Sequence, residues 1–371
     1  MLRFFFFFVA LWFLCLLPHA LPHPCIGVTY SAPSGSSNHH SQEVERISGG
    51  LRQLKAKSLR LENADPSITR SLLYTNTTLF LTIPNYMVSQ IAQNRSVAES
   101  WLYTHVVPFY PRVKITTISV GNAFPDVHPE SLNDLLPAIS NVHVSLRVLG
   151  IRKIKVSTSF SFVTALSSPF PPSHAQFQEP QGITLFGPLL QFLQDTDSCF
   201  LINLYPYNLY RLNPEIPLGI ALFQEYPFNF RDDFITGVRY RNLFDVMVDA
   251  VVTALAVAGY ETIPLVVTET GWPSFSALGN EFDANLGYAG IYLKGLVKHL
   301  KSGMGTPLLK DGVREVFVYE MFDKDEGTGR SWGVLYANGT AKYRVDFSSS
   351  SLPSSPVRLA VIIVFLIFVI A

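Results

Sequence analysis

The chain has 371 residues, and its 28 basic and 28 acidic side chains give a formal net charge of zero. This balance provides no field that would attract nucleic acid or another charged polymer, whereas a neutral polymer is compatible with it. Aromatic residues make up 13% of the sequence, which is enough both for a core and for flat faces that contact a ligand.

The first 20 residues have the form of a secretory signal peptide. Arg3 supplies a basic start, residues 4–17 form an apolar run, and Ala20 is a small residue suited to cleavage. The run is too short to predict a membrane span. We therefore expect residues 1–20 to be removed from a secreted protein.

After the signal, short apolar segments alternate with amphipathic ones. Eight segments are typical of buried strands: residues 26–30, 58–61, 79–85, 114–121, 153–159, 200–207, 264–268 and 315–322. Segments with helical spacing lie between them: residues 43–55, 66–73, 87–92, 97–107, 132–149, 185–194, 243–258 and 285–301. This alternation predicts an α/β fold, a single (β/α)8 TIM barrel over residues 21–347.

Two segments between these elements have no regular period. Residues 170–181 are rich in proline and glutamine, and residues 208–238 are rich in proline and aromatic residues. A loop as long as the second is usually functional in a compact domain. Its aromatic residues either line a ligand cleft or form a core private to the loop, and both interpretations stay open: Tyr207, Tyr210, Phe223, Tyr226, Phe228 and Phe230.

The seventh predicted strand runs into Val-Thr-Glu-Thr-Gly-Trp-Pro at residues 267–273. Glu269 thus lies at the carboxyl end of a barrel strand, where TIM barrels place their chemistry. Trp272 offers a flat apolar face, and a carboxylate beside an aromatic wall suggests sugar chemistry. The alternative is that Glu269 only caps the following helix.

Seven ordered motifs extend this interpretation. They are Ile-Gly-Val-Thr-Tyr at 26–30, Leu-Arg-Leu at 59–61, Ser-Val-Gly-Asn at 119–122, Lys-Val-Ser-Thr at 155–158, Ile-Asn-Leu-Tyr-Pro-Tyr at 202–207, Asn-Leu-Phe-Asp at 242–245, and the stretch at 266–274. With these motifs the chain resembles the plant endo-1,3-β-glucanases of glycoside hydrolase family 17 over residues 26–347. The resemblance implies retaining hydrolysis of β-1,3-glucan such as callose, and the sequence shows no pattern for a cofactor or a metal ion.

Retaining hydrolysis needs two carboxyl groups about 5 Å apart, one as nucleophile and one as general acid and base. The resemblance assigns the nucleophile to Glu269. It assigns the acid/base to the residue after Gly-Asn at the end of the fourth strand, which is Ala123 in this chain. Alanine cannot donate a proton, and a positioned acid contributes about 10²–10⁴-fold. We therefore expect hydrolysis to be weak or absent.

Four other positions match the family and are expected to bind the substrate: Asn122, Asn203, Tyr205 and Trp272. Three further positions are expected to bind the substrate, Glu62, Phe322 and Lys324, and two of them depart from the family. Glu62 replaces the tyrosine of Arg-Leu-Tyr, and Phe322-Asp323-Lys324 replaces Phe-Asn-Glu, so that Lys324 stands where the family has a glutamate.

Three carboxylates are candidates for a substitute acid: Glu62 at the barrel mouth, and Asp126 and Glu130 in the loop after Ala123. For each of them, the favoured interpretation is a solvated loop carboxylate.

Three Asn-x-Ser/Thr triplets fit the secretory route and predict N-glycosylation at Asn76, Asn94 and Asn338. Loss of the signal peptide leaves two cysteines, Cys25 and Cys199. They could pair in an oxidising compartment, but strands so far apart in sequence can also lie on opposite walls of a barrel.

The C-terminal end has the layout of a GPI-attachment signal. Residues 348–351 are small and polar, residues 352–358 form a spacer, and residues 359–371 are continuously apolar. Thirteen apolar residues are too few to span roughly 30 Å of hydrocarbon, which disfavours an ordinary tail anchor. We expect residues 348–371 to be removed and a monomer to be anchored at the outer face of the plasma membrane, in the cell wall.

Three functions are compatible with these observations. The first is a surface-anchored enzyme that acts on β-1,3-glucan. The second is a pseudo-enzyme that binds this glucan without cutting it, which Ala123 and Lys324 favour. The third is a structural wall protein without a saccharide ligand, which the matches at Asn203, Tyr205 and Trp272 disfavour.

Overall fold

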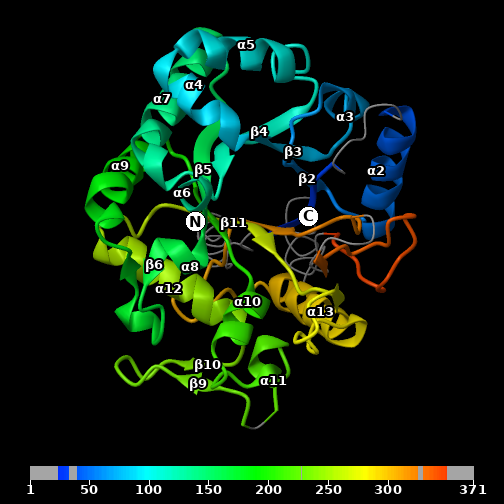
Figure 1. Cartoon of the computed structure of the whole chain (residues 1–371), viewed down its shortest axis with the longest axis vertical. Helices are drawn as coiled ribbons and strands as arrows, with labels where there is room; N and C mark the ends of the chain where they lie inside the picture. The colour runs from blue at the N-terminus through cyan, green and yellow to red at the C-terminus, as the bar shows by residue number, and fades with distance from the viewer. Residues whose placement is uncertain (1–23, 33–39, 227, 325–328, 349–371) are drawn as a thin grey trace, which may run out of the picture.

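The computed structural model describes residues 24–32, 40–226, 228–324 and 329–348, so the predicted signal peptide and, apart from Ser348, the predicted GPI signal lie outside the described residues. Eight parallel strands close into a barrel in the order β1, β2, β3, β4, β5, β8, β11 and β13, and helices surround it (Figure 1). The predicted (β/α)8 barrel is thereby confirmed. None of the helices in this part of the chain has the length and apolar character needed to span a bilayer.

The elements of the barrel correspond one by one to the predicted segments. The strands are β1 (Cys25–Tyr30), β2 (Ser58–Leu61), β3 (Thr78–Ile83), β4 (Lys114–Asn122), β5 (Lys155–Ser161), β8 (Phe200–Asn203), β11 (Leu265–Thr270) and β13 (Glu315–Val318). The helices around them are α2 (His40–Leu54), α3 (Pro66–Ser71), α4 (Val88–Gln93), α5 (Arg95–His105), α7 (Leu132–Val148), α9 (Gly187–Asp195), α12 (Leu243–Val257) and α13 (Leu286–Ser302).

Shorter elements occupy the connections. The short helices are α6 (Phe124–Val127), α8 (Phe162–Ala165), α10 (Pro206–Leu212) and α11 (Leu218–Ala221), with single turns at Asn85–Met87, Pro129–Ser131, Pro172–His174 and Gly182–Phe186. Three two-stranded antiparallel ribbons pair β6 (Leu166–Ser167) with β7 (Gln176–Phe177), β9 (Arg231–Asp232) with β10 (Arg239–Tyr240), and β12 (Phe275–Ser276) with β14 (Arg330–Ser331).

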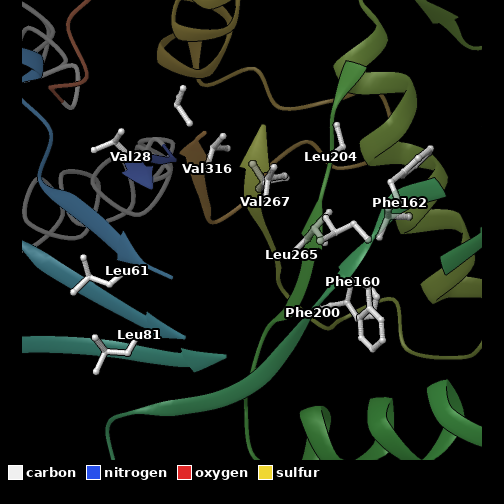
Figure 2. Close-up of a cluster of buried hydrophobic side chains, with 14 of the residues drawn as sticks. Val28, Leu61, Leu81, Phe160, Phe162, Phe200, Leu204, Leu265, Val267 and Val316 are labelled. Carbon is white, nitrogen blue, oxygen red and sulfur yellow. The ribbon is translucent and has the colours of Figure 1, made fainter. Parts of the chain in front are cut away.

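Side chains along each barrel strand alternate between two environments. One set forms a separate buried layer inside the barrel: Phe80, Cys199, Leu201, Val266 and Phe317. The other set faces the helices and joins the main core, as Figure 2 shows for Val28, Leu61 and Val267 on three different strands. This double burial explains why the strands appear in the sequence as nearly continuous apolar runs.

The prediction was wrong in the segment that follows β8. We expected a strand over residues 200–207 and no regular structure over 208–238, but β8 ends at Asn203 and Pro206 begins α10. Proline is favoured at the first turn of a helix because its missing N–H has no partner there. The remainder folds into α11 and the β9–β10 hairpin, which lies at the bottom of Figure 1.

The aromatic residues of this segment divide between the two interpretations left open above. Tyr207 and Phe223 pack against other rings of the barrel, and the ring centre of Tyr207 lies 5.0 Å from that of Trp272. In contrast, Tyr226 is 65% exposed and Phe228 is 87% exposed. The segment therefore has a packed inner side and an open aromatic rim.

Cys25 and Cys199 are both free thiols. Cys25 begins β1 and Cys199 precedes β8, and two strands, β11 and β13, lie between these in the barrel order. The pairing that the sequence left open is absent from this structure.

Gly27 of β1 gives a test of the packing inside the barrel. A Cβ at this position would lie 2.6 Å from Cδ1 of Phe317 and 3.0 Å from Cβ of Ser58. Because Phe317 is fully buried and cannot move aside, we expect Gly27→Ala to lower the free energy of unfolding by about 1–3 kcal/mol. Urea denaturation of the purified protein measures this change.

Gly49 in α2 is the matched control, since no atom lies within 4 Å of a Cβ built there. Gly49→Ala should leave stability unchanged or raise it by up to about 1 kcal/mol through helix propensity. Equal effects of the two substitutions would contradict the packing described here.

Candidate active site

Glu269 is the centre of a hydrogen-bond network at the carboxyl end of the barrel, and it is 6% exposed. Its Oε1 accepts from Nη1 of Arg60 at 2.7 Å and from Nδ2 of Asn122 at 2.8 Å, and its Oε2 accepts from the hydroxyl of Tyr205 at 2.6 Å. Bonds of this kind to a carboxylate are short and strongly orienting. The alternative that Glu269 caps the next helix is wrong, because Asn285 caps α13.

Asn122 is itself fixed by two further side chains. Nδ2 of Asn203 donates to Oδ1 of Asn122 at 2.9 Å, and the hydroxyl of Thr268 donates to Oδ1 of Asn203 at 2.7 Å. Since its Oδ1 is used as an acceptor, Asn122 must turn its Nδ2 toward Glu269. The structure thus brings together four predicted site residues from three strands and the loop after β8, and their contact with a sugar stays a prediction.

Tyr205 can act only as a donor in this network. Burial, followed by the negative charge of Glu269, raises the pKa of Tyr205 well above its ordinary value. Its hydroxyl therefore stays protonated, and the bond to Oε2 of Glu269 persists over the working range of pH.

The end of β4 is shaped by its backbone. Gly121 has a φ of +78°, and a Cβ there would lie 2.9 Å from Oδ1 of Asn85. Asn85 bonds both backbone groups of Asn122, accepting from its N–H at 2.8 Å and donating to its carbonyl at 3.0 Å. This side-chain clamp sets the direction in which Asn122 leaves the strand.

Ala123 comes next and adopts the left-handed conformation, with φ 46° and ψ 39°. This region is disfavoured for an alanine by roughly 1–2 kcal/mol, and such strain often gathers at functional sites. The backbone N–H of Ala123 is held by the carbonyl of Ser159 at 2.8 Å. A residue at this position is therefore fixed directly beside Asn122, but the methyl group of alanine has no proton to give.

Arg60 is fully buried, and only one of its three guanidinium nitrogens has a partner. Nη1 bonds Glu269, while Nε and Nη2 have no hydrogen bond within the described structure. Its carbon Cζ lies 5.6 Å from the ring centre of Phe80, its register partner on β3. Sequence analysis placed Arg60 only in a motif, although its alternation with buried residues indicated an inward-facing position.

A second polar cluster lies on the β1, β2 and β13 side of the mouth. The hydroxyl of Ser31 donates to Oε2 of Glu320 at 2.5 Å, and Nζ of Lys324 lies 3.7 Å from the same oxygen. Lys324 also donates to the hydroxyl of Tyr319 at 3.1 Å. Sequence analysis missed Ser31 and Glu320, because single polar residues after a strand carry no spacing signal.

Glu62 stands two residues after Arg60 on the same face of the chain. Burial raises the pKa of Glu62, the charge of Glu269 raises it further, and Arg60 and Lys324 oppose the rise. Glu62 is therefore within electrostatic reach of Glu269 and is not freely solvated. The other two candidate acids are exposed and engaged elsewhere: Asp126 accepts from Thr164, and Glu130 lies 3.3 Å from His128.

Aromatic rings form one wall of the mouth. Trp332 is partly exposed, and its ring centre lies 5.0 Å from that of Tyr205 and 6.3 Å from that of Tyr319. Gly271 makes this wall possible, since a Cβ there would lie 2.6 Å from the carbonyl oxygen of Tyr319 and 3.3 Å from Trp332. Trp332 belongs to none of the motifs, so no pattern in the sequence predicted it as a residue of the site.

Two predicted substrate-binding rings are buried instead. Trp272 is 4% exposed, packs against Tyr207 and donates its indole N–H to the carbonyl of Asp283 at 2.8 Å. Phe322 is 5% exposed and packs against Tyr30. Trp272 supports the wall through Tyr207, whose ring centre lies 6.0 Å from that of Trp332, and the contact of either buried ring with a sugar stays a prediction.

The family model of the glycosyl hydrolases family 17 matches residues 26–347, which is most of the chain. This chain belongs to glycosyl hydrolases family 17. The resemblance that the motifs indicated is confirmed at the level of the family.

Named relatives agree with this assignment. A probable glucan endo-1,3-beta-glucosidase, A6 of Arabidopsis thaliana, is 33% identical over 88% of this chain and 68% of its own length. Glucan endo-1,3-beta-glucosidase 2 of the same plant is 36% identical over 88% of this chain and 64% of its own length. This family 17 chain therefore spans about two thirds of the length of these relatives.

Solved structures of similar proteins have the same fold. CJP38, a beta-1,3-glucanase and allergen of Cryptomeria japonica pollen, is 29% identical, with a TM-score of 0.79 over 87% of this chain and 99% of that one. One of two plant beta-glucan endohydrolases is 30% identical, with a TM-score of 0.75 over 86% of this chain and 99% of that one.

The ion pair between Arg60 and Glu269 gives a test of the network. Removing one partner of a buried pair leaves an uncompensated charge, so we expect Arg60→Met to lower the free energy of unfolding by about 3–5 kcal/mol. Adding Glu269→Gln to this variant removes the orphaned charge and should recover part of the loss. Urea denaturation of the wild type, both single variants and the double variant measures the coupling, and additive effects would contradict a direct pair.

Glu320 gives a test based on pH. Burial raises the pKa of Glu320 from its ordinary value of 4.5 to about 7, and the charge of Lys324 opposes this rise. The folded protein therefore binds this proton more tightly than the unfolded chain. The resulting stabilisation is complete below about pH 4.5 and is lost as the pH rises to about 7.

We expect Glu320→Gln to reduce the fall in unfolding free energy between pH 4.5 and 7. Glu315, whose pKa burial also raises to about 7, is present in both proteins and cancels in the difference. Urea denaturation at a series of pH values gives the two curves, and parallel curves would show that Glu320 does not hold the proton.

Proposed function

We propose that this protein binds β-1,3-glucan such as callose at the mouth of the barrel and hydrolyses it weakly. The observation that carries the proposal is the contrast between two neighbouring positions. Asn122 orients the carboxylate of Glu269 at 2.8 Å, whereas the residue after it, where the family resemblance expects the proton donor, is Ala123.

The network around Glu269 suits a nucleophile. Arg60, Asn122 and Tyr205 hold both carboxylate oxygens in place, so the attack on the anomeric carbon needs little reorganisation. Arg60 also places a positive charge directly against this carboxylate, at 2.7 Å. The nucleophilic half of the first step is thus supported by residues that remain in this chain.

The departure of the leaving sugar is the impaired step. Its oxygen leaves as an alcohol only if a group within hydrogen-bond reach donates a proton. Loss of that donor slows the reaction by about 10²–10⁴-fold, which corresponds to a rise of about 3–5 kcal/mol in the activation free energy. In a glucan the leaving group is a sugar, which is a poor leaving group. The loss of rate therefore belongs near the upper end of this range.

Glu62 supports only limited rescue. It has the raised pKa of a proton donor, but it follows β2, whereas Ala123 follows β4, with β3 between them in the barrel. A proton from Glu62 would reach the sugar from a different direction than one delivered from position 123. General acid catalysis requires the proton donor to lie within hydrogen-bond reach of the leaving oxygen. We therefore propose weak turnover of the glucan and not normal turnover.

The location of the protein is a proposal from its terminal sequences. A signal peptide at residues 1–20 and a GPI signal at residues 348–371 would give a secreted protein anchored at the outer face of the plasma membrane, in the cell wall. The asparagines of the three predicted glycosylation triplets are exposed, which supports this route: Asn76, Asn94 and Asn338.

A second candidate is a protein that binds β-1,3-glucan without any turnover. The observation that favours it is the cluster at the mouth, where Lys324 pairs with Glu320 and stands where the resemblance expects a glutamate. With Ala123, Lys324 is a second position at the mouth where an ionisable group differs from the one that the resemblance expects. The binding residues Asn203 and Tyr205 are unaffected by either change.

Restoring the acid separates these candidates. Release of reducing sugar from laminarin should rise by about 10²–10⁴-fold in Ala123→Glu, because the backbone already holds this position beside Asn122. Ala123→Gln has nearly the same size without a proton to donate and should show no gain. Adding Glu269→Ala to Ala123→Glu should abolish the turnover.

An aryl glucoside with a good leaving group gives the complementary measurement, because it needs little help from an acid. On this substrate the ratio between Ala123→Glu and the wild type should shrink toward one for the first step, measured as kcat/KM, whereas hydrolysis of the glycosyl–enzyme still lacks the base in the wild type. No gain on laminarin in Ala123→Glu would contradict the assignment of position 123. Binding of glucan oligosaccharides without turnover of either substrate would favour the second candidate.

A further inference from the structure

A wide groove lies beside the barrel mouth, with a volume of about 1280 Å³. Its walls come from the β12 region, the start of α13, the segment after β13, and the turn that follows β14. Figure 1 shows this C-terminal part of the chain, in orange to red, running between α13 and α2. The volume exceeds that of a usual small-molecule site and suits a branched or extended ligand.

Asn338 belongs to the lining of this groove. It lies in a tight turn, in which the N–H of Gly339 donates to the carbonyl of Tyr336 at 2.8 Å and the N–H of Tyr336 donates to the carbonyl of Thr340 at 2.9 Å. Arg46 of α2 fixes the turn by donating to the carbonyl of Ala337 at 2.9 Å. The turn therefore presents Asn338 in a defined direction.

The side chain of Asn338 is free to carry a glycan. Its Oδ1 accepts from the N–H of Thr340 at 3.0 Å and from the hydroxyl of Thr340 at 2.8 Å. Its Nδ2, the atom to which an N-linked glycan attaches, has no hydrogen bond within the described structure. Asn338 is also exposed, as the attachment of a glycan requires.

Two open aromatic rings line the same groove. Phe275 is 59% exposed and Tyr336 is 41% exposed. Nζ of Lys342 lies 5.3 Å from the ring centre of Tyr336, and Lys342 is held by Asp323. Exposed rings beside fixed polar groups are the usual composition of a ligand-binding surface, and they match the apolar faces and hydroxyl groups of sugars.

The other two predicted glycosylation sites differ in position. Asn76 precedes β3 and therefore lies at the amino end of the barrel, away from the mouth. Asn94 caps α5, where its Oδ1 accepts from the N–H of Ser96 at 2.9 Å. Neither residue is in the lining of the groove.

We propose that the inner sugars of an N-linked glycan on Asn338 lie in this groove against Phe275 and Tyr336, and that they narrow the approach to the barrel mouth. The link to the mouth is Lys324, which lines the groove and also contacts Glu320 and Tyr319. The seating of the glycan rests on the proposed secretory route alone, whereas its effect on glucan access rests also on the proposed binding of glucan.

The seating is tested on the folded, full-length glycoprotein with a peptide-N-glycosidase. Mass spectrometry of the peptides over time gives the release rate at Asn338, Asn76 and Asn94 separately. We expect release at Asn338 to be about tenfold slower than at the other two sites, which corresponds to about 1.4 kcal/mol of contact free energy. Phe275→Ser should remove most of this difference.

Phe282 supplies the matched control, because it is 84% exposed but lies outside the lining of the groove. Phe282→Ser should leave the slow release at Asn338 unchanged. Equal release at all three sites in the wild-type protein, or a wild-type protein without a glycan at Asn338, would overturn the proposal.

The narrowing of the mouth is tested by calorimetric titration with laminarin oligosaccharides. Asn338→Gln should bind several-fold more tightly than the wild type, and Asn76→Gln should bind like the wild type. Slow release at Asn338 with unchanged affinity in Asn338→Gln would overturn the narrowing. Absence of binding in every variant would count against the proposed function and not against the seating.

Discussion

The buried ion pair between Arg60 and Glu269 is the constraint on which the mouth of this barrel depends. Arg60 has no exposed surface, and two of its nitrogens have no partner in the described structure, so burial of its charge is costly. Among the described residues, the hydrogen-bonded contact at 2.7 Å with Glu269 offsets most of that cost, and the ring of Phe80 adds a weaker contact at 5.6 Å. Because Asn122 and Tyr205 bond the same carboxylate, the pair joins the ends of four elements, and a displacement of any one of them would leave a charge unpaired.

In this arrangement, the orientation of the Glu269 carboxylate does not depend on the residue at position 123. Orientation of the carboxylate comes from β2, β4 and the loop after β8, and none of the bonds involves the side chain at position 123. The orienting network is therefore complete with an alanine in that place. On the opposite side, Ser31 and Lys324 hold Glu320 in a polar cluster of their own. The mouth of this family 17 chain thus retains the fixed carboxylate of Glu269. The groups at positions 123 and 324 differ from those that the family resemblance leads us to expect.

Much of the fold could be predicted, because strands buried on both faces appear as apolar runs and the helices between them have a clear period. The end of β8 could not, since Leu204 to Tyr207 continue the apolar run while Pro206 already starts a helix. Of the site, Asn122, Asn203 and Tyr205 were predicted from motifs. Trp332 and Glu320 were missed, because their position depends on how the segment after β13 folds back across the mouth. Trp272 was placed in the open, although its ring is covered by Tyr207 and Tyr210.

Gly271 has a consequence for how such chains are classified. The glycine is required by the close approach of Tyr319 and Trp332, which is a matter of space and not of reactivity. A lineage that stopped cleaving its polysaccharide would still need the glycine, and the residues around it would stay recognisable. That signature therefore records how tightly the mouth is packed and carries no information on proton donation. Under the function proposed above, the residue that follows the Gly-Asn pair at the end of β4 is the position that carries it.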